Sequence, residues 1–163
     1  MKRVALHNLG CKVNSYELDA IGQKLREKGF LVVPFDEKAD IYIVNTCSVT
    51  NIADRKSRQM LHQAKKRNPE AVVVAAGCYV QTAAKQVLAD AAVDLVVGNN
   101  RKKDMAEILE EYLSKRSGED GTDKTLGGRT VIDIGGEAVY EEMQLTDTTG
   151  HTRACIKIQD GCN

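Results

Sequence analysis

The chain has 163 residues, the usual size of one domain, and its 23 basic and 23 acidic residues give a net charge of zero. This balance disfavours a free-standing nucleic-acid-binding protein, and an aromatic content of 4% without Trp disfavours a base-stacking platform. The apolar runs are too short to span a membrane and the N-terminal run is too short for a signal peptide, so we expect a cytoplasmic protein with reduced thiols.

Apolar runs and amphipathic segments alternate over residues 1–117. The runs predict five strands, at Val4–His7, Phe30–Pro34, Ile41–Asn45, Ala71–Ala76 and Asp94–Val97. The amphipathic segments predict helices at Asn14–Lys28, Asn51–Arg67, Thr82–Asp90 and Arg101–Lys115. This alternation predicts an α/β fold, an open parallel sheet of about five strands with helices on both faces, of the flavodoxin or Rossmann type.

Composition changes after this α/β segment. Residues 118–152 are rich in Gly, Asp and Thr and predict a linker or irregular segment, with short strands at Val131–Ile134 and Ala138–Tyr140. Ala154–Ile158 predicts the first strand of another unit. We therefore expect residues 153–163 to be the truncated start of a second domain.

Three cysteines occupy equivalent places, just past the ends of predicted strands. Cys11 follows VALHNLG, Cys47 follows IYIVNT and Cys78 follows VVVAAG. The carboxyl ends of parallel strands share one edge of the sheet, where ligands bind, so we expect the three thiols to meet. Three thiolates with a fourth position left open suit an iron–sulfur cluster with one open iron.

Other interpretations of these cysteines stay open. Their spacings, 36 residues from Cys11 to Cys47 and 31 from Cys47 to Cys78, are unlike the short pairs of zinc ribbons. Each could be a small buried core residue, which is the default for a free cysteine. A zinc site built from the same three thiols and a water is a further alternative.

The residues around the cysteines support a site. Gly10 and Gly77 would let the backbone approach a bulky ligand closely. Side chains that could donate hydrogen bonds to sulfur follow the same strands, at Asn14, Asn45, Thr46, Ser48 and Gln81. Ordinary helix capping is the alternative role for Asn14 and Ser48.

A basic stretch lies on the second predicted helix. Arg55, Lys56 and Arg58 could contact a phosphate backbone, although a solvated helix face is the favoured interpretation. Phosphate-binding glycine motifs are absent from the sequence, so nucleotide binding would rest on fold analogy alone.

Four motifs occur in order: LGCKVNSYE, NTCSVT, AGCYVQ and RACIKIQDGCN. Together they resemble the N-terminal domain of the radical S-adenosylmethionine methylthiotransferases. The resemblance implies that Cys11, Cys47 and Cys78 hold an auxiliary [4Fe-4S] cluster. It also implies that Cys162 is the first ligand of a second [4Fe-4S] cluster, whose other two cysteines would lie beyond residue 163.

The resemblance implies a tRNA-modifying enzyme with two clusters and S-adenosylmethionine, of which this chain would be a fragment without catalytic residues. The motifs look most like the type that adds a methylthio group to N6-threonylcarbamoyladenosine next to the anticodon. Isopentenyladenosine in tRNA and an aspartate of a ribosomal protein are alternative substrates. tRNA would bind mainly through the missing domains, and the oligomeric state is not indicated. An alternative of another class is a flavodoxin-like binding or interaction domain with structural cysteines.

Overall fold

The computed structural model describes residues 1–48 and 50–116, together with Lys124, Met143 and Ile158. Within these residues, five parallel strands form one sheet in the order β2-β1-β3-β4-β5. The strands are β1 (Arg3–Asn8), β2 (Leu31–Val33), β3 (Ile41–Thr46), β4 (Val72–Gly77) and β5 (Leu95–Val97). The predicted open parallel sheet of the α/β class is confirmed.

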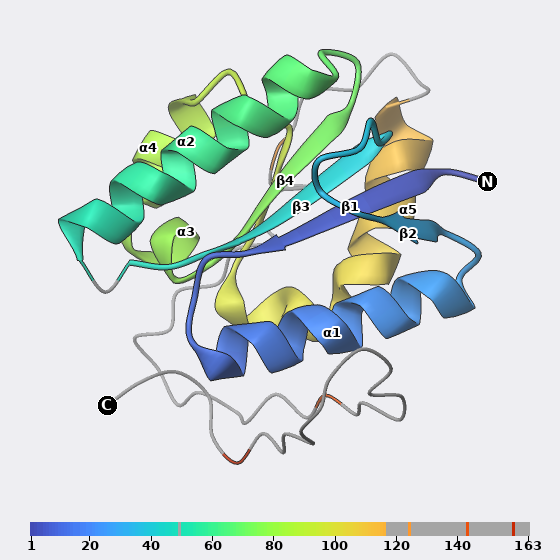
Figure 1. Cartoon of the computed structure of the whole chain (residues 1–163), viewed down its shortest axis with the longest axis horizontal. Helices are drawn as coiled ribbons and strands as arrows, with labels where there is room; N and C mark the ends of the chain where they lie inside the picture. The colour runs from blue at the N-terminus through green and yellow to red at the C-terminus, as the bar shows by residue number, and fades with distance from the viewer. Residues whose placement is uncertain (49, 117–123, 125–142, 144–157, 159–163) are drawn as a thin grey trace.

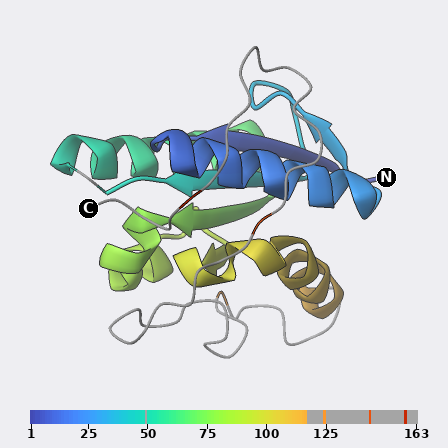
Figure 2. The ribbon, with the colours of Figure 1, turned by 90° about the horizontal axis from the view of Figure 1, so that it is seen from below.

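Helices cover both faces of this sheet. They are α1 (Lys12–Glu27), α2 (Asn51–Arg67), α3 (Cys78–Thr82), α4 (Ala84–Ala89), the 3-10 helix η1 (Asn99–Asp104) and α5 (Met105–Arg116). In Figure 1, α2 and α4 lie above the strands and α1 lies below them. Figure 2, seen from below, shows α1 in front of the strands, and α5 packs in the same apolar core as α1. Within the described part of the chain, no helix is long and apolar enough to cross a bilayer.

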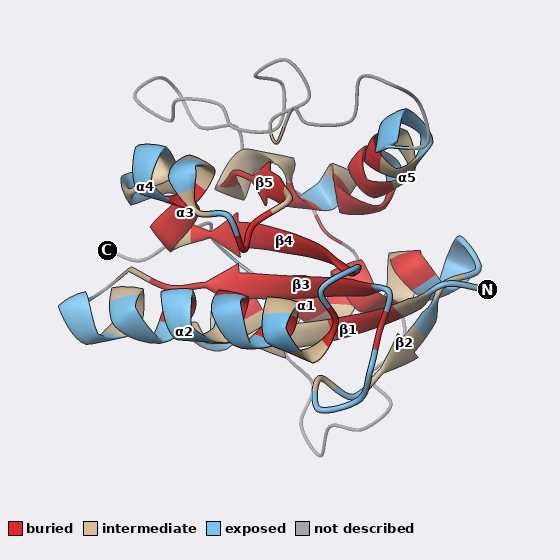
Figure 3. Ribbon diagram, turned by 90° about the horizontal axis from the view of Figure 1, so that it is seen from above, coloured by how far each residue is buried: buried red, intermediate tan, exposed pale blue. Residues whose placement is uncertain are grey.

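Strand residues alternate between two separate apolar cores. Val72 and Val74 of β4 pack with α1 and α5, whereas Val73 and Ala75 pack with α2 and α4. All six residues of β3 and of β4 are buried, which Figure 3 shows as red central strands. Burial on both faces explains why the sequence of these strands is almost continuously apolar.

Local sequence signals set several element ends. Gly29 has a φ of 86° directly after the C-cap of α1, a conformation that glycine adopts without strain. Thr50 caps α2, because its side chain accepts a hydrogen bond from the Ala53 amide at 3.1 Å. The alternative that Ser48 caps this helix is therefore wrong. Pro34 follows β2, which is an edge strand as its sequence predicts.

Two predicted helices differ from the structure. Instead of one helix at Thr82–Asp90, the structure has two short helices, α3 from Cys78 to Thr82 and α4 from Ala84 to Ala89, which meet at Ala83 (φ −125°, ψ 36°). The Thr82 hydroxyl, whose one proton serves one acceptor at a time, lies 3.2 Å from the Cys78 carbonyl oxygen, 3.4 Å from that of Tyr79 and 2.9 Å from Ser48 Oγ. The segment predicted at Arg101–Lys115 begins two residues earlier, as η1, and continues as α5.

Two described residues of the predicted linker contact the α/β unit. The amide of Val96 in β5 donates to the Lys124 carbonyl at 2.9 Å. Met143 is buried in the core beside α1 and α5, and its carbonyl accepts a hydrogen bond from the Tyr16 hydroxyl at 2.9 Å. The strands predicted at Val131–Ile134, Ala138–Tyr140 and Ala154–Ile158 lie outside the described residues, apart from Ile158.

Candidate metal centre

The carboxyl ends of the strands form one edge of the sheet, and the three predicted cysteines lie there. Strand order reverses at β1, because the chain passes from β1 to β2 on one side and returns to β3 on the other. Open α/β sheets bind ligands at the carboxyl edge near such a reversal. This edge lies on the left of Figure 1, where α1, α2 and α3 begin.

The strand register places the cysteines at adjacent strand ends. Thr46 of β3 pairs with Gly77 of β4, so Cys47 and Cys78 follow directly from two paired residues. Cys11 follows β1, the strand on the other side of β3. Thiols separated by up to 67 residues in the chain (from 11 to 78) thus share one edge of the sheet.

The three cysteines differ in exposure. Cys11 is the N-cap residue of α1 and is exposed, Cys47 is buried after β3, and Cys78 is the half-buried first residue of α3. All three are thiols rather than disulfide partners. A packing role suits Cys47, but it does not explain Cys11, because a core residue is shielded from water.

Gly77, directly before Cys78, has no room for a side chain against the end of β3. Its φ of 101° and ψ of −165° lie in a region that is essentially confined to glycine. A Cβ at this position would lie 2.3 Å from the Thr46 carbonyl oxygen and 2.8 Å from Asn45 Oδ1. A larger residue would therefore displace the chain that carries Cys78.

Two asparagines join the start of α1 to the end of β3. Asn45 Nδ2 donates to the Asn14 carbonyl at 2.9 Å, and Asn14 Nδ2 donates to the Thr46 carbonyl at 3.3 Å. A Cβ on Gly10 would lie 1.8 Å from Asn14 Nδ2, so a residue with a side chain there would displace this amide. These bonds hold the turn with Cys11 beside β3. Both bonds go to carbonyl oxygens, and Asn14 does not cap α1. Hydrogen-bond donation to sulfur therefore stays a prediction for both asparagines.

The other predicted neighbours occupy the same edge. Thr46 Oγ1 donates to the Ala76 carbonyl at 2.5 Å and so links β3 to β4. Ser48 Oγ accepts a hydrogen bond from Thr82 Oγ1 at 2.9 Å, which joins the segment after Cys47 to α3. Gln81 is partly buried in α3. A direct role toward sulfur stays a prediction for these three residues as well.

Asn99 belongs to this edge although the sequence analysis did not include it. Its Nδ2 donates to Cys78 Sγ at 3.7 Å. Ala76 of β4 pairs with Val97 of β5, and continuing this register by two residues brings Asn99 beside Cys78. The signal was present in the sequence, because Asn99 follows a predicted strand just as the three cysteines do.

Tyr79 fixes the turn that carries Cys78. Its ring is 2% exposed and packs in the core under α2. Burial raises the pKa of its hydroxyl, which has no hydrogen-bond partner among the described residues. The ring therefore anchors α3 mainly by apolar packing.

The residues at this edge fit an iron–sulfur cluster in their donor chemistry, because thiolates are the usual protein ligands of such clusters. Asn45 Oδ1 is buried beside Gly77 and has no hydrogen-bond partner among the described residues, so it remains free to accept a hydrogen bond. Within residues 1–48 and 50–116, however, no three His, Cys, Asp or Glu side chains are grouped to hold a metal ion. Binding through all three thiols therefore requires their side chains to turn toward one another.

The basic residues of α2 divide into two groups. Lys65 Nζ contacts Asp94 Oδ2 at 2.8 Å, and Arg67 donates to the Phe35 carbonyl, so both residues have structural roles. The second group, near the start of α2, is exposed, and within the described residues its members form no ion pair: Arg55, Lys56 and Arg58. This second group is available to a phosphate backbone, and Lys66, near the other end of α2, is exposed as well.

His7 of β1 lies in an aromatic stack. Its ring centroid is 4.6 Å from that of Phe35, and the Arg67 guanidinium lies 5.2 Å from the same Phe35 ring. Burial, and secondarily the charge of Arg67, lower the pKa of His7. The folded protein therefore favours the neutral imidazole.

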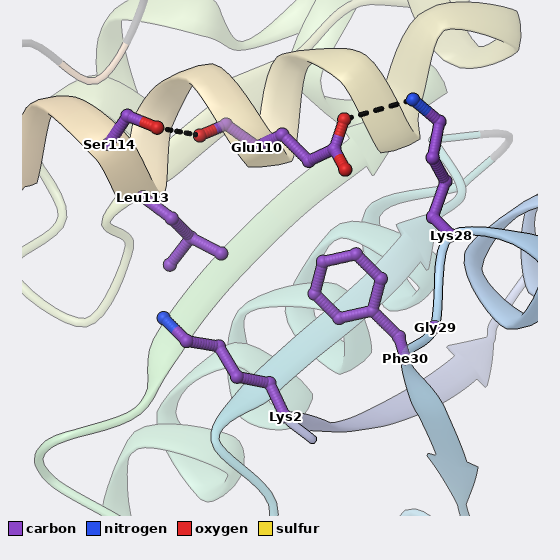
Figure 4. Close-up of a pocket in the computed structure, with 7 residues that line it drawn as sticks. All are labelled: Lys2, Lys28, Gly29, Phe30, Glu110, Leu113 and Ser114. Carbon is purple, nitrogen blue, oxygen red and sulfur yellow. Dashed lines mark hydrogen bonds and ion pairs between the residues drawn. The ribbon is translucent and has the colours of Figure 1, made fainter.

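A separate hollow of about 540 Å³ lies at the opposite edge of the sheet, where β1 and β2 begin. Figure 4 shows its lining: Lys2, Lys28, Gly29, Phe30, Glu110, Leu113 and Ser114. Lys28 Nζ bonds to Glu110 Oε2 at 3.0 Å, an interaction that raises the pKa of Lys28. This hollow contains no thiol or imidazole and is unrelated to the cysteine edge.

Cys162, which the resemblance assigns to a second cluster, lies outside the described residues.

Comparisons with known proteins give a consistent result. The family described as "Uncharacterized protein family UPF0004" matches residues 3–98, a stretch that includes all three cysteines. The chain is 40% identical to the threonylcarbamoyladenosine tRNA methylthiotransferase MtaB of Bacillus subtilis, over 100% of this chain and 34% of the relative. It is 41% identical to the protein of the same name from Aquifex aeolicus, over 99% of this chain and 37% of the relative.

A relative with another substrate in its name is less similar. The tRNA-2-methylthio-N(6)-dimethylallyladenosine synthase of Opitutus terrae is 31% identical, over 85% of this chain and 28% of the relative. The chain thus spans about a third of the length of these curated relatives.

Proposed function

This chain belongs to the UPF0004 family, and from that premise we propose that it is the cluster-bearing part of a radical S-adenosylmethionine tRNA methylthiotransferase. Its three cysteines, Cys11, Cys47 and Cys78, are the proposed ligands of an auxiliary [4Fe-4S] cluster. A radical S-adenosylmethionine domain would begin near residue 153, with Cys162 as the first ligand of its own cluster. We place the enzyme in the cytoplasm, where thiols stay reduced.

One observation carries this proposal: three thiols follow the ends of three adjacent parallel strands, beside the reversal of strand order. The exposed Cys11 favours a ligand role over simple packing. Gly77 adds a second argument, because its backbone conformation, essentially confined to glycine, connects the end of β4 to Cys78 where a side chain would collide with β3.

The bound cluster would supply an iron with an open coordination position, suited to holding sulfur for transfer. The residues of this chain would hold and orient it. Cys11, Cys47 and Cys78 would provide thiolates. The hydrogen bonds of Asn14 and Asn45 would keep the start of α1, with Cys11, next to the end of β3, with Cys47. A protein that supplied a fourth thiolate would close the position that the reaction needs.

We propose N6-threonylcarbamoyladenosine of tRNA as the substrate. The support is the identity of 40 and 41% to two relatives named for this nucleoside, against 31% to a relative named for dimethylallyladenosine. The exposed start of α2 is the proposed contact with the tRNA backbone, through Arg55, Lys56 and Arg58, because it lies at the same edge as the cysteines.

Anaerobic reconstitution of the 163-residue chain with iron and sulfide tests the cluster. We expect about four irons and four sulfides per chain and a brown charge-transfer absorption. Replacement of any one of Cys11, Cys47 and Cys78 by Ala should lower iron content strongly. The matched control is Cys155→Ala, because Cys155 is not one of the three strand-end cysteines and its replacement should leave iron content unchanged.

Three outcomes would refute the cluster proposal. A colourless chain without iron would favour the binding domain with structural cysteines, and zinc without visible absorption would favour a zinc site. Unchanged iron content in Cys47→Ala would also refute it.

Nucleoside mass spectrometry tests the substrate. The full-length protein that contains this chain is expressed in a strain from which the genes of the host's own methylthiotransferases have been deleted. We expect the methylthio form of N6-threonylcarbamoyladenosine to return with the wild-type protein but not with Cys47→Ala. Return of methylthiolated isopentenyladenosine, or of a methylthiolated ribosomal-protein aspartate, would replace the proposed substrate by one of the alternatives.

A further inference from the structure

Asn99 reaches the cysteine edge from a fourth strand end, that of β5. Its Nδ2 lies 3.7 Å from Cys78 Sγ, within hydrogen-bonding distance for sulfur. Its Oδ1 is buried and has no hydrogen-bond partner among the described residues. A buried amide oxygen without a partner is costly, so the orientation of this amide calls for an explanation. Turning the amide over would place its oxygen against the sulfur.

A buried ion pair fixes the helix that begins with Asn99. Lys102 Nζ, one turn along η1, lies 2.6 Å from Glu17 Oε2 of α1, with side-chain exposures of 2% and 6%. Lys24 Nζ of α1 also donates to the Lys103 carbonyl at 2.6 Å. Because a buried charge cannot leave its partner without a large penalty, η1 stays docked on α1. Asn99 is thereby held beside Cys78 rather than left to swing into solvent.

We propose that Asn99 tunes the auxiliary cluster by donating an N–H···S hydrogen bond to its Cys78 ligand; this inference rests on the proposed function. A thiolate accepts such a bond more strongly than a thiol does, because the bond becomes charge-assisted. Reduction of the cluster adds negative charge that its ligands share, so the donor stabilises the reduced form and raises the reduction potential.

The test is a redox titration of the reconstituted 163-residue chain, followed by electron paramagnetic resonance. Asn99→Leu removes the donor and roughly keeps the shape. We expect full iron content but about a tenfold smaller equilibrium constant for reduction, which is a potential about 59 mV more negative for one electron. The matched control is Asn100→Leu, because Asn100 has no hydrogen bond to a cysteine among the described residues. Its potential should equal that of the wild type.

The outcomes separate this inference from the proposed function. A wild-type chain that takes up no iron overturns both. A wild-type cluster with the same potential in Asn99→Leu overturns the role of Asn99 and leaves the cluster proposal standing, as does an equal shift in Asn100→Leu. If Asn99→Leu does not fold, Asn99→Ala replaces it, because this variant removes the N–H donor without adding a charge. Its potential should then be more negative than that of the wild type, and an unchanged value overturns the inference.

Discussion

Replacing Gly77 by Ala tests the link between backbone conformation and the cysteine edge. Gly77 combines a φ of 101° with a ψ of −165°, and an added Cβ would lie 2.3 Å from the Thr46 carbonyl oxygen. The substitution therefore has two costs. The backbone conformation disfavours any residue with a Cβ, and β4 must also move away from β3 to admit the methyl group.

The two costs can be estimated separately. Holding a residue with a Cβ in this backbone region costs about 1–3 kcal/mol. Forcing an extra methyl group into a packed region costs about 1–3 kcal/mol more. The total of about 2–6 kcal/mol is a large part of the stability of a domain, which is about 5–15 kcal/mol. Because Cys78 is the next residue, the same movement should also impair iron uptake.

Gly29→Ala is the matched control. Gly29 also has a positive φ, 86°, but a Cβ there would meet no atom within 4 Å. It should lose only about 1–2 kcal/mol, the cost of a left-handed backbone. Urea unfolding of both apo variants measures these losses, and anaerobic reconstitution measures iron. Gly77→Ala should lose more stability than Gly29→Ala and bind less iron, whereas Gly29→Ala should bind iron like the wild type.

Equal unfolding midpoints for the two glycine variants would refute the steric argument. Wild-type iron content in a folded Gly77→Ala chain would show that the position of Cys78 does not depend on this glycine.

Three further predictions concern stability, each measured by urea unfolding. Lys102→Met should cost about 3–5 kcal/mol, because Glu17 stays buried without its partner, and the double variant with Glu17→Leu should recover most of the loss; equal losses would contradict this. The pKa of His7 is lowered in the folded state, so the unfolded state binds more protons below pH 6.5. The free energy of unfolding should therefore decrease as the pH is lowered below 6.5. His7→Phe should flatten that dependence, and an unchanged pH profile would be evidence against it. Met143→Ala should cost about 2–5 kcal/mol, and a loss near zero would contradict its place in the core.

Much of the fold could be predicted because burial on both faces leaves a simple signal. Residues 71–76 read as a strand from their apolar sequence alone, and the structure has β4 at Val72–Gly77. The break between α3 and α4 could not be predicted in this way. It depends on the non-helical backbone at Ala83 and on a helix that starts at Cys78 itself, and neither changes the apolar pattern.

The position of the candidate site could be predicted, but its hydrogen bonds could not. The rule that parallel strands share a carboxyl edge was enough to place Cys11, Cys47 and Cys78 at one edge of the sheet, whereas the meeting of their thiols stays a prediction. Which neighbour bonds to which atom depends on the register between strands far apart in sequence. Asn14 reaches a carbonyl of β3 for this reason, and Asn99 reaches Cys78 only because β5 pairs with β4.

The three thiols follow three different strands, β1, β3 and β4, so the sheet must fold before one ligand can contact all of them. Any peptide that contains all three must run from Cys11 to Cys78, and the thiols become neighbours only after two parallel pairings have formed. Such long-range pairings are slow to form. A ligand that needs all three sulfurs can therefore bind only after the sheet has folded. Such a ligand could be inserted only after β4 and Cys78 have been translated.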